Sequence, residues 1–151
     1  TFSLSQRLNE ISEVEVKEAQ EGDILKNGVV YIAPGGKHMR VVKKGTDYCI
    51  KLSDEPAIDG LRPCANVMYE SLENCQYDEI TCVVLTGMGA DGTKGIQGLA
   101  AHHKKLHVIA QDADTCVVYG MPKAIAQTGL VDEVVPLGSV AETITKNVGV
   151  S

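Results

Sequence analysis

The first residues of the chain show a helical pattern. Apolar residues from Leu4 to Ile11 recur at the spacing of one helix face. The segment Ser3-Leu4-Ser5-Gln6 is typical of a capping box, with Ser3 as the N-cap residue. We therefore expect a short helix that ends at about Ser12.

Short strand patterns follow this predicted helix. The turn Lys26-Asn27-Gly28 predicts a hairpin between the second and third of them. A second hairpin is expected from the last two, whose connecting turn carries Lys43 and Lys44, as suits strands at a sheet edge. We expect this part of the chain to be antiparallel. The strand patterns cover residues 14–16, 24–25, 29–33, 38–42 and 48–52.

From residue 64 onward, helical patterns alternate with short apolar runs. Such alternation indicates βαβ units and a parallel sheet covered on both faces. The last helix is preceded by Ser139-Val140-Ala141-Glu142, which predicts a second capping box. The predicted fold class is α/β: a doubly wound, mostly parallel sheet with an inserted antiparallel hairpin, in one domain over residues 1–151. Helices are expected at 64–75, 93–103, 122–128 and 140–148, and strands at 81–86, 106–111 and 131–135.

Composition narrows the class of protein. The 151 residues are 44% hydrophobic and 23% charged, which is typical of a soluble globular domain. Acidic residues outnumber basic ones by 20 to 14, so the net charge of −6 disfavours binding to nucleic acid or anionic lipid. The longest apolar runs are far shorter than the roughly 18 residues that span a bilayer, and no signal pattern opens the chain. We expect a cytoplasmic protein without direct membrane insertion.

The cysteines and histidines show no ligand spacing. The five cysteines are odd in number and form no Cys-x-x-Cys pair, so we interpret them as packing residues. His102, His103 and His107 flank a predicted helix-to-strand turn, where we expect solvated side chains. No carboxylate or cysteine completes a metal site with them. The sequence therefore predicts neither a metal nor a cofactor.

A glycine-rich segment follows the predicted strand 81–86. Gly87-Met88-Gly89-Ala90-Asp91-Gly92 satisfies the G-x-G-x-x-G pattern, and Asp112 lies about 20 residues further on, as in dinucleotide-binding folds. However, Asp91 would place a carboxylate beside the pyrophosphate at the helix N-terminus. The motif also lies in mid-chain instead of in the first βα turn. Dinucleotide binding is therefore the weaker alternative.

Asp91 can instead be the functional group of this segment. A carboxylate at a helix N-terminus is expected to stay ionised, and an ionised aspartate suits the orientation of a histidine in a Ser-His-Asp triad. Asp91 could equally be a cap of its own helix. The segment alone does not separate these two roles.

Five separated motifs, in order over nearly the whole chain, resemble the catalytic domain of the chemotaxis protein-glutamate methylesterase family, CheB. They are Val16-Lys17-Glu18-Ala19 with Gly22-Asp23, residues 31–39 (YIAPGGKHM), residues 85–92 (LTGMGADG), Ala110-Gln111-Asp112 with residues 117–124 (VVYGMPKA), and residues 129–132 (GLVD).

The resemblance implies a serine hydrolase that demethylates glutamate methyl esters on the cytoplasmic helices of methylated chemoreceptors, and in many members also deamidates glutamine. It implies that Asp91 is the acid of the triad and that Met88 lines the site. The other implied residues are Thr86, Gly87, Gly89 and Gly92 in the active-site loop, and His38, Met121 and Pro122 at a possible site edge.

The chain departs from the family pattern in its other catalytic motifs. The family has its nucleophile in a Gly-x-Ser-Thr-Gly-Gly loop and its base in a Gln-His-Met-Pro motif, both upstream of the matched part, and neither is present here. None of the seven serines lies on a strand-to-helix elbow between glycines. We expect a domain incomplete at its N-terminus, inactive alone, with the missing N-terminal segment as a partner. A catalytically dead receptor-binding module is the alternative.

Overall fold

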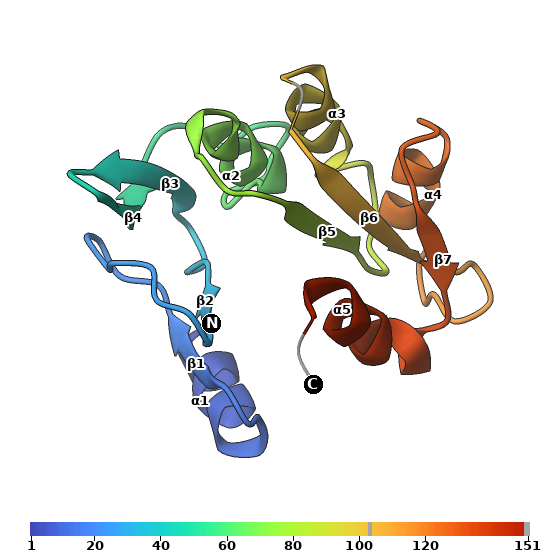
Figure 1. Cartoon of the computed structure of the whole chain (residues 1–151), viewed down its shortest axis with the longest axis horizontal. Helices are drawn as coiled ribbons and strands as arrows, with labels where there is room; N and C mark the ends of the chain where they lie inside the picture. Colours follow the sequence, from blue (N-terminus) through green and yellow to red (C-terminus); the bar gives the residue numbers. More distant parts are fainter. Residues whose placement is uncertain (103, 150–151) are drawn as a thin grey trace. The chain divides into compact units, whose positions relative to one another are not determined.

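The computed structural model describes residues 1–102 and 104–149, which fold into two compact units. The N-terminal unit covers Thr1–Cys75 and the C-terminal unit covers Gln76–Ser151. Both are mixed α/β: the N-terminal unit has a parallel strand pair and an antiparallel hairpin, and the C-terminal unit has a parallel sheet (Figure 1). No helix in the described part of the chain is long and apolar enough to cross a membrane.

The N-terminal unit begins with α1 (Phe2–Ile11), close to the predicted bounds. The expected capping box is wrong, because the helix starts before Ser3 and its N-cap residue is Thr1, without a side-chain cap. Ser3 therefore lies inside the first turn. Ser5 is the buried residue of this helix, and its hydroxyl donates to the Phe2 carbonyl at 2.6 Å.

Strands β1 (Glu15–Glu18) and β2 (Val29–Ile32) form a parallel pair in which Glu15 lies opposite Val29. The predicted hairpin across residues 24–33 is therefore wrong. The backbone of residues 23–25 pairs with residues 48–50 instead of with β2. Leu25 N–H donates to the Tyr48 carbonyl at 2.9 Å, and Ile50 N–H donates to the Asp23 carbonyl at 2.8 Å. Because Leu25 N–H and the Asp23 carbonyl are bonded there, they do not form a hairpin with β2.

The second predicted hairpin is confirmed. Strands β3 (His38–Lys44) and β4 (Asp47–Ser53) pair antiparallel along their whole length. Helix α2 (Ala65–Ser71) packs on β3 and ends in the 3₁₀ turn η1 (Leu72–Asn74), earlier than predicted. The Ser71 hydroxyl joins the two elements, since it accepts from Val41 N–H at 2.9 Å.

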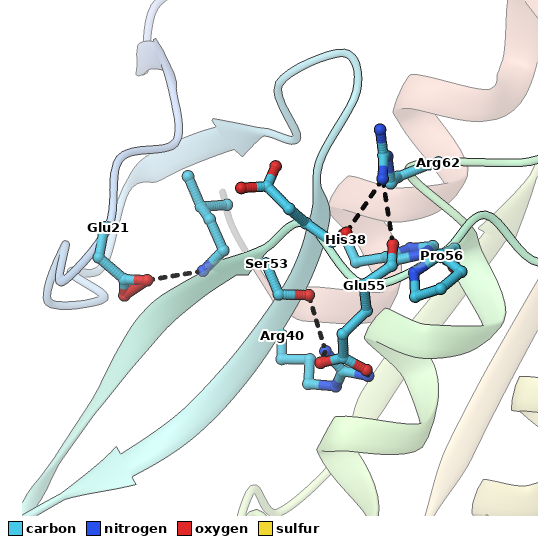
Figure 2. Close-up of polar contacts among 9 residues, drawn as sticks. Glu21, His38, Arg40, Ser53, Glu55, Pro56 and Arg62 are labelled. Carbon is cyan, nitrogen blue, oxygen red and sulfur yellow. Dashed lines mark hydrogen bonds and ion pairs between the residues drawn. The ribbon is translucent and has the colours of Figure 1, made fainter.

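Charged side chains hold the segment that leaves β4 (Figure 2). The Arg40 guanidinium donates to both carboxylate oxygens of Glu55, at 3.0 and 3.3 Å. Arg62 donates to the backbone carbonyls of Asp54 and Glu55, at 3.1 and 3.3 Å. Residues 54–55 are therefore fixed from both sides of the chain although they belong to no regular element.

The C-terminal unit follows the predicted alternation closely. Its three strands form one parallel sheet in the order β5-β6-β7. Helices α3 and α4 lie on one side of this sheet and α5 on the other (Figure 1). The elements are β5 (Ile80–Val84), α3 (Thr93–Ala101), β6 (Leu106–Gln111), α4 (Met121–Ala126), β7 (Glu133–Val135), the 3₁₀ turn η2 (Leu137–Ser139) and α5 (Val140–Val148).

The core of this unit lies around the central strand β6. Its last four residues, from Val108 to Gln111, are all buried, as expected for a strand covered on both faces. Ile96 and Leu99 of α3 and Ile125 of α4 are fully buried as well. The polar Gln111 thus sits in an apolar environment.

The second capping box is also wrong. Ser139 is the N-cap residue of α5, but its side chain makes no cap hydrogen bond. Ser139 ends the turn η2 with φ −103° and ψ −2°, whereas an N-cap residue that bonds its helix normally has extended backbone.

The Asp23 carboxylate of the N-terminal unit is held by an ion pair and a backbone hydrogen bond. It forms an ion pair with Lys17 at 2.9 Å and accepts from Gln20 N–H at 2.9 Å. Burial raises the pKa of Asp23, but the Gln20 hydrogen bond and Lys17 outweigh burial and leave this pKa below its usual value.

Asp23→Asn should lower the free energy of unfolding by about 1 kcal/mol at pH 7. The pKa of Asp23 in the folded state lies below its usual value of 3.8, so this stabilisation is present above pH 3.8 and is lost as pH falls through the folded pKa. Urea denaturation from pH 7 to pH 2.5 measures the difference between variant and wild type. The control is Asp54→Asn, which breaks the exposed Lys37–Asp54 pair and should change stability little. An equal deficit for Asp23→Asn at all pH values would contradict this linkage.

Candidate active site

The glycine loop (residues 86–92) joins β5 to α3 at the carboxyl end of the parallel sheet. Gly89 and Gly92 have φ angles of +86° and +95°, which side chains with a Cβ rarely adopt. Gly92 is the N-cap residue of α3, so Asp91 lies directly before the helix. Asp91 is half-buried, whereas Met88 is 86% exposed. The loop therefore presents a carboxylate and a thioether at the end of the sheet.

A second segment, residues 117–122, lies against the start of the glycine loop. The Thr86 hydroxyl donates to the Val118 carbonyl at 3.0 Å and accepts from Val118 N–H at 2.8 Å. Gly87 N–H also donates to the Val118 carbonyl, and Gly87 pairs with Tyr119 as an isolated parallel bridge. Two motifs that are about 30 residues apart in the sequence are thus one structural unit.

Gly120 and Met121 complete this contact. The Gly87 carbonyl accepts from Gly120 N–H at 3.1 Å and from Met121 N–H at 2.8 Å. A Cβ on Gly120 would lie 2.7 Å from the Gly87 carbonyl oxygen, and a Cβ on Gly87 would overlap Met121 Sδ. Pro122 is buried in the first turn of α4, where a proline is tolerated. Met121 therefore holds the loop backbone through its N–H, whereas the site-edge role of Pro122 stays a prediction.

The exposed apolar residues of the two segments gather around the glycine loop. Val117 is 90% exposed, a large value for a side chain without polar atoms. Exposed apolar residues of this kind are typical of surfaces that contact a partner or substrate. The residues are Leu85, Met88, Val117, Val118 and Tyr119.

Gln111 belongs to the same structural unit, although no functional role was predicted for it from the sequence. Its side chain is 1% exposed and its carbonyl accepts from Thr86 N–H at 2.8 Å. The sequence signal is an uncharged polar residue at the end of an otherwise apolar strand run. Such a residue is buried only where hydrogen bonds satisfy it.

Asp112, the second acidic residue of the dinucleotide pattern, is engaged in its own turn. Its Oδ1 accepts from the backbone N–H and the hydroxyl of Thr115, at 3.0 and 2.6 Å. This arrangement is an Asx-type turn and supports a structural role for Asp112.

His38 lies in the N-terminal unit, at the start of β3, and is buried with 1% exposure. Its Nε2 is 2.9 Å from the Pro56 carbonyl, the contact drawn in Figure 2. The Nδ1 atom has no hydrogen-bond partner among the described residues. The geometry thus gives His38 a structural contact, and a role at the site edge stays a prediction.

The other histidines depart in part from the expected solvated surface. His107 is only 24% exposed, and its Nε2 lies 2.7 Å from a Glu133 carboxylate oxygen, so the expectation is wrong for this residue. His102 is exposed, with Nδ1 2.8 Å from the Gly98 carbonyl, and His103 lies outside the described residues. Within residues 1–102 and 104–149, no group of three or more His, Cys, Asp or Glu could hold a metal ion.

The cysteines are free thiols, and most are core residues. Cys116 is half-buried, whereas the other four are buried, as the packing interpretation predicts: Cys49, Cys64, Cys75 and Cys82.

Together these features define an α/β protein with an aspartate on a tight glycine loop at the carboxyl end of a parallel sheet, the position where such folds carry ligands and catalytic groups. A family model described as CheB methylesterase matches residues 1–144. The chain belongs to the CheB methylesterase family.

Known relatives agree with this assignment. The chain is 43% identical over 150 residues to a protein of Desulfotalea psychrophila and 45% identical over 147 residues to one of Oceanobacillus iheyensis. Both are named protein-glutamate methylesterase/protein-glutamine glutaminase. The matches cover 98% and 97% of this chain but only 41% and 42% of the relatives.

A solved structure shares the fold. The crystal structure of the Thermotoga maritima CheB methylesterase catalytic domain superposes with a TM-score of 0.89 at 36% sequence identity. The match covers 97% of this chain and 76% of that chain. The predicted α/β class, with mostly parallel strands and an antiparallel hairpin, is therefore confirmed.

Gly120→Ala should destabilise the C-terminal unit by about 1–3 kcal/mol, because the new Cβ would overlap the backbone of Gly87 and Gly89. Urea denaturation gives the change in stability, and backbone amide shifts report which residues move. We expect the largest shift changes at Gly87 and Gly89.

The matched control is Gly138→Ala, since a Cβ at Gly138 meets no atom within 4 Å. Equal stability of the two variants would contradict the close packing of Gly120.

Proposed function

We propose that this chain is the aspartate-bearing portion of a protein-glutamate methylesterase catalytic domain, which hydrolyses glutamate methyl esters on chemoreceptors. The observation that carries the proposal is the position of Asp91. It lies on the glycine loop at the carboxyl end of the sheet, in a chain that matches methylesterases over nearly its full length. Asp91 is then the acid of a Ser-His-Asp triad, and Met88 lines the site.

The proposed reaction is an acyl transfer in two steps. A serine oxygen attacks the ester carbonyl, and a histidine takes the serine proton and passes it to the departing methanol. Water then attacks the acyl-enzyme and releases the glutamate carboxylate, with the same histidine as base. Asp91 accepts a hydrogen bond from the imidazole, fixes its tautomer and stabilises the imidazolium. The same steps on a glutamine side chain would release ammonia, which would account for the glutaminase named for the relatives.

The serine and the histidine must come from a segment other than the matched part, because the chain has neither family motif. The β5 strand supports such a partner: it is an edge strand of the described sheet, yet Ile80, Cys82 and Val84 are buried. Edge strands of parallel sheets are normally covered. We propose that the catalytic segment adds beside β5 and forms one domain with residues 1–151.

We propose that the substrate contacts the exposed apolar residues around the glycine loop. These are Leu85, Met88, Val117, Val118 and Tyr119. We propose a cytoplasmic location as well, because the family resemblance implies a substrate on the cytoplasmic helices of chemoreceptors. Nucleic acid is no part of the proposal, because the chain carries a net charge of −6.

The chain should release methanol from methylated receptor membranes only when it is mixed with a separately produced segment that bears the serine and histidine motifs. In the mixture, Asp91→Asn should lower the rate by about 10³- to 10⁴-fold, because the imidazole loses its orienting carboxylate. The control Asp47→Asn changes an exposed aspartate at the start of β4 and should leave the rate unchanged.

Methanol release by the chain alone would contradict the assignment of the nucleophile to another segment. Silence of the mixture, with receptor binding retained, would indicate a docking module without catalysis. Saturable binding of NAD or NADP would instead favour the dinucleotide alternative.

A further inference from the structure

The main-chain pairing between β5 and β6 ends at Val84 and Ala110. Beyond this point the two strands diverge into loops, and Thr86 is exposed to solvent. Gln111 follows Ala110 directly, and its side chain is 1% exposed. A hydrogen bond from Thr86 N–H to this side chain joins the two strands beyond the last backbone pair. A buried amide in this position is stable only when all its polar atoms are satisfied.

Each end of the Gln111 amide has a partner that fits one orientation only. Oε1 accepts from Thr86 N–H at 2.8 Å, and a backbone N–H can only donate. Nε2 donates to the Thr115 carbonyl at 2.9 Å and to the Thr115 hydroxyl oxygen at 3.2 Å. The amide therefore links the loop after β5 to the loop after β6.

The Thr115 hydroxyl extends this link to the third strand of the sheet. It donates to Asp112 Oδ1 at 2.6 Å and accepts from Leu137 N–H at 3.0 Å, in the turn that follows β7. One hydrogen-bonded network, with Gln111 as its buried member, thus joins the segments at the carboxyl ends of β5, β6 and β7. Its members share partners, so the loss of one alters the others.

Thr86 is held at two points. Its N–H is bound by Gln111, and its hydroxyl both donates to and accepts from the backbone of Val118. The glycines that follow have no side chains to fix the loop by packing. Thr86 is therefore one anchor at the start of the loop that carries Asp91, together with the backbone bonds of Gly87.

We propose that Gln111 is a positioning residue for the methylesterase site: its buried amide fixes Thr86, and through Thr86 the loop that carries Asp91. Gln111 acts through the loop and touches neither substrate nor imidazole. This inference rests on the proposed role of Asp91 in the same loop, but the order of the loop can be measured without any activity.

The first experiment measures amide hydrogen exchange by NMR on the whole chain. Gln111→Met keeps the length of the side chain but removes its donors and acceptor, so Thr86 N–H loses its partner. We expect exchange at Thr86 and Gly87 to accelerate at least about ten-fold relative to wild type, with a smaller change at Val108 and Ile109.

Thr128→Val is the matched control, because it removes a hydroxyl that donates to the Ile125 carbonyl at 2.6 Å, at the end of α4. It should leave exchange at Thr86 unchanged. Thr115→Val removes one of the two acceptors of Gln111 Nε2 and should give an intermediate effect at Thr86. Unchanged exchange at Thr86 in Gln111→Met, or equal acceleration of every amide, would overturn the positioning role.

The second experiment measures steady-state methanol release by the chain mixed with the serine- and histidine-bearing segment. Gln111→Met should lower kcat by about 10- to 100-fold and change KM less than about two-fold, because the acid is displaced while the receptor contact remains. The double variant Gln111→Met with Thr115→Val should lose less than the product of the two single losses.

The two experiments separate the two proposals. An inactive wild-type mixture would reject the proposed function, and the exchange data would still decide whether Gln111 fixes the loop. An active mixture in which Gln111→Met retains the wild-type kcat would reject the positioning role alone.

Discussion

The peptide group of Gly87 is the point on which the candidate site depends. Its N–H donates to the Val118 carbonyl, and its carbonyl accepts from the N–H groups of Gly120 and Met121. These bonds bring the two backbones so close that a Cβ on Gly120 would overlap the Gly87 carbonyl oxygen, while a Cβ on Gly87 would meet the Met121 side chain. Because the same carbonyl accepts from the first residues of α4, the loop and the helix are fixed relative to each other. The loop that carries Asp91 is thereby tied to the start of α4.

The loop geometry is also tied to the core. Gln111 is buried at the end of β6, next to apolar residues such as Ile109 that are fully covered. A buried amide is costly unless its hydrogen bonds are made, so the fold is most stable when Thr86 and Thr115 lie at bonding distance. The stability of the C-terminal unit is in this way coupled to the ordering of the two surface loops that carry Thr86 and Thr115. The exposed residues Met88 and Val117 lie on these ordered loops and can contact another surface without first being fixed.

Under the proposed function, the contacts that orient the acid lie within the C-terminal unit. Segments 86–92 and 115–122 belong to this unit and bond to each other. The nucleophile and the base come from another segment, so catalysis requires assembly, whereas the geometry of the Asp91 loop does not. Under this proposal, the acid is preorganised before the nucleophile and the base join it.

Local patterns in the sequence were sufficient for most elements of the fold. The bounds of β6 and α5 agree with prediction, and the β3–β4 hairpin forms, because apolar periodicity and short-range turns are local properties. The Asp91 loop was identified for the same reason, since glycines at a strand end mark a tight turn. Tertiary structure decided the rest: the parallel pairing of β1 with β2, the contact of His107 with Glu133, and the burial of Gln111. In each case a polar group is satisfied by a partner that is distant in the sequence. Which partner it bonds is decided only when the chain packs.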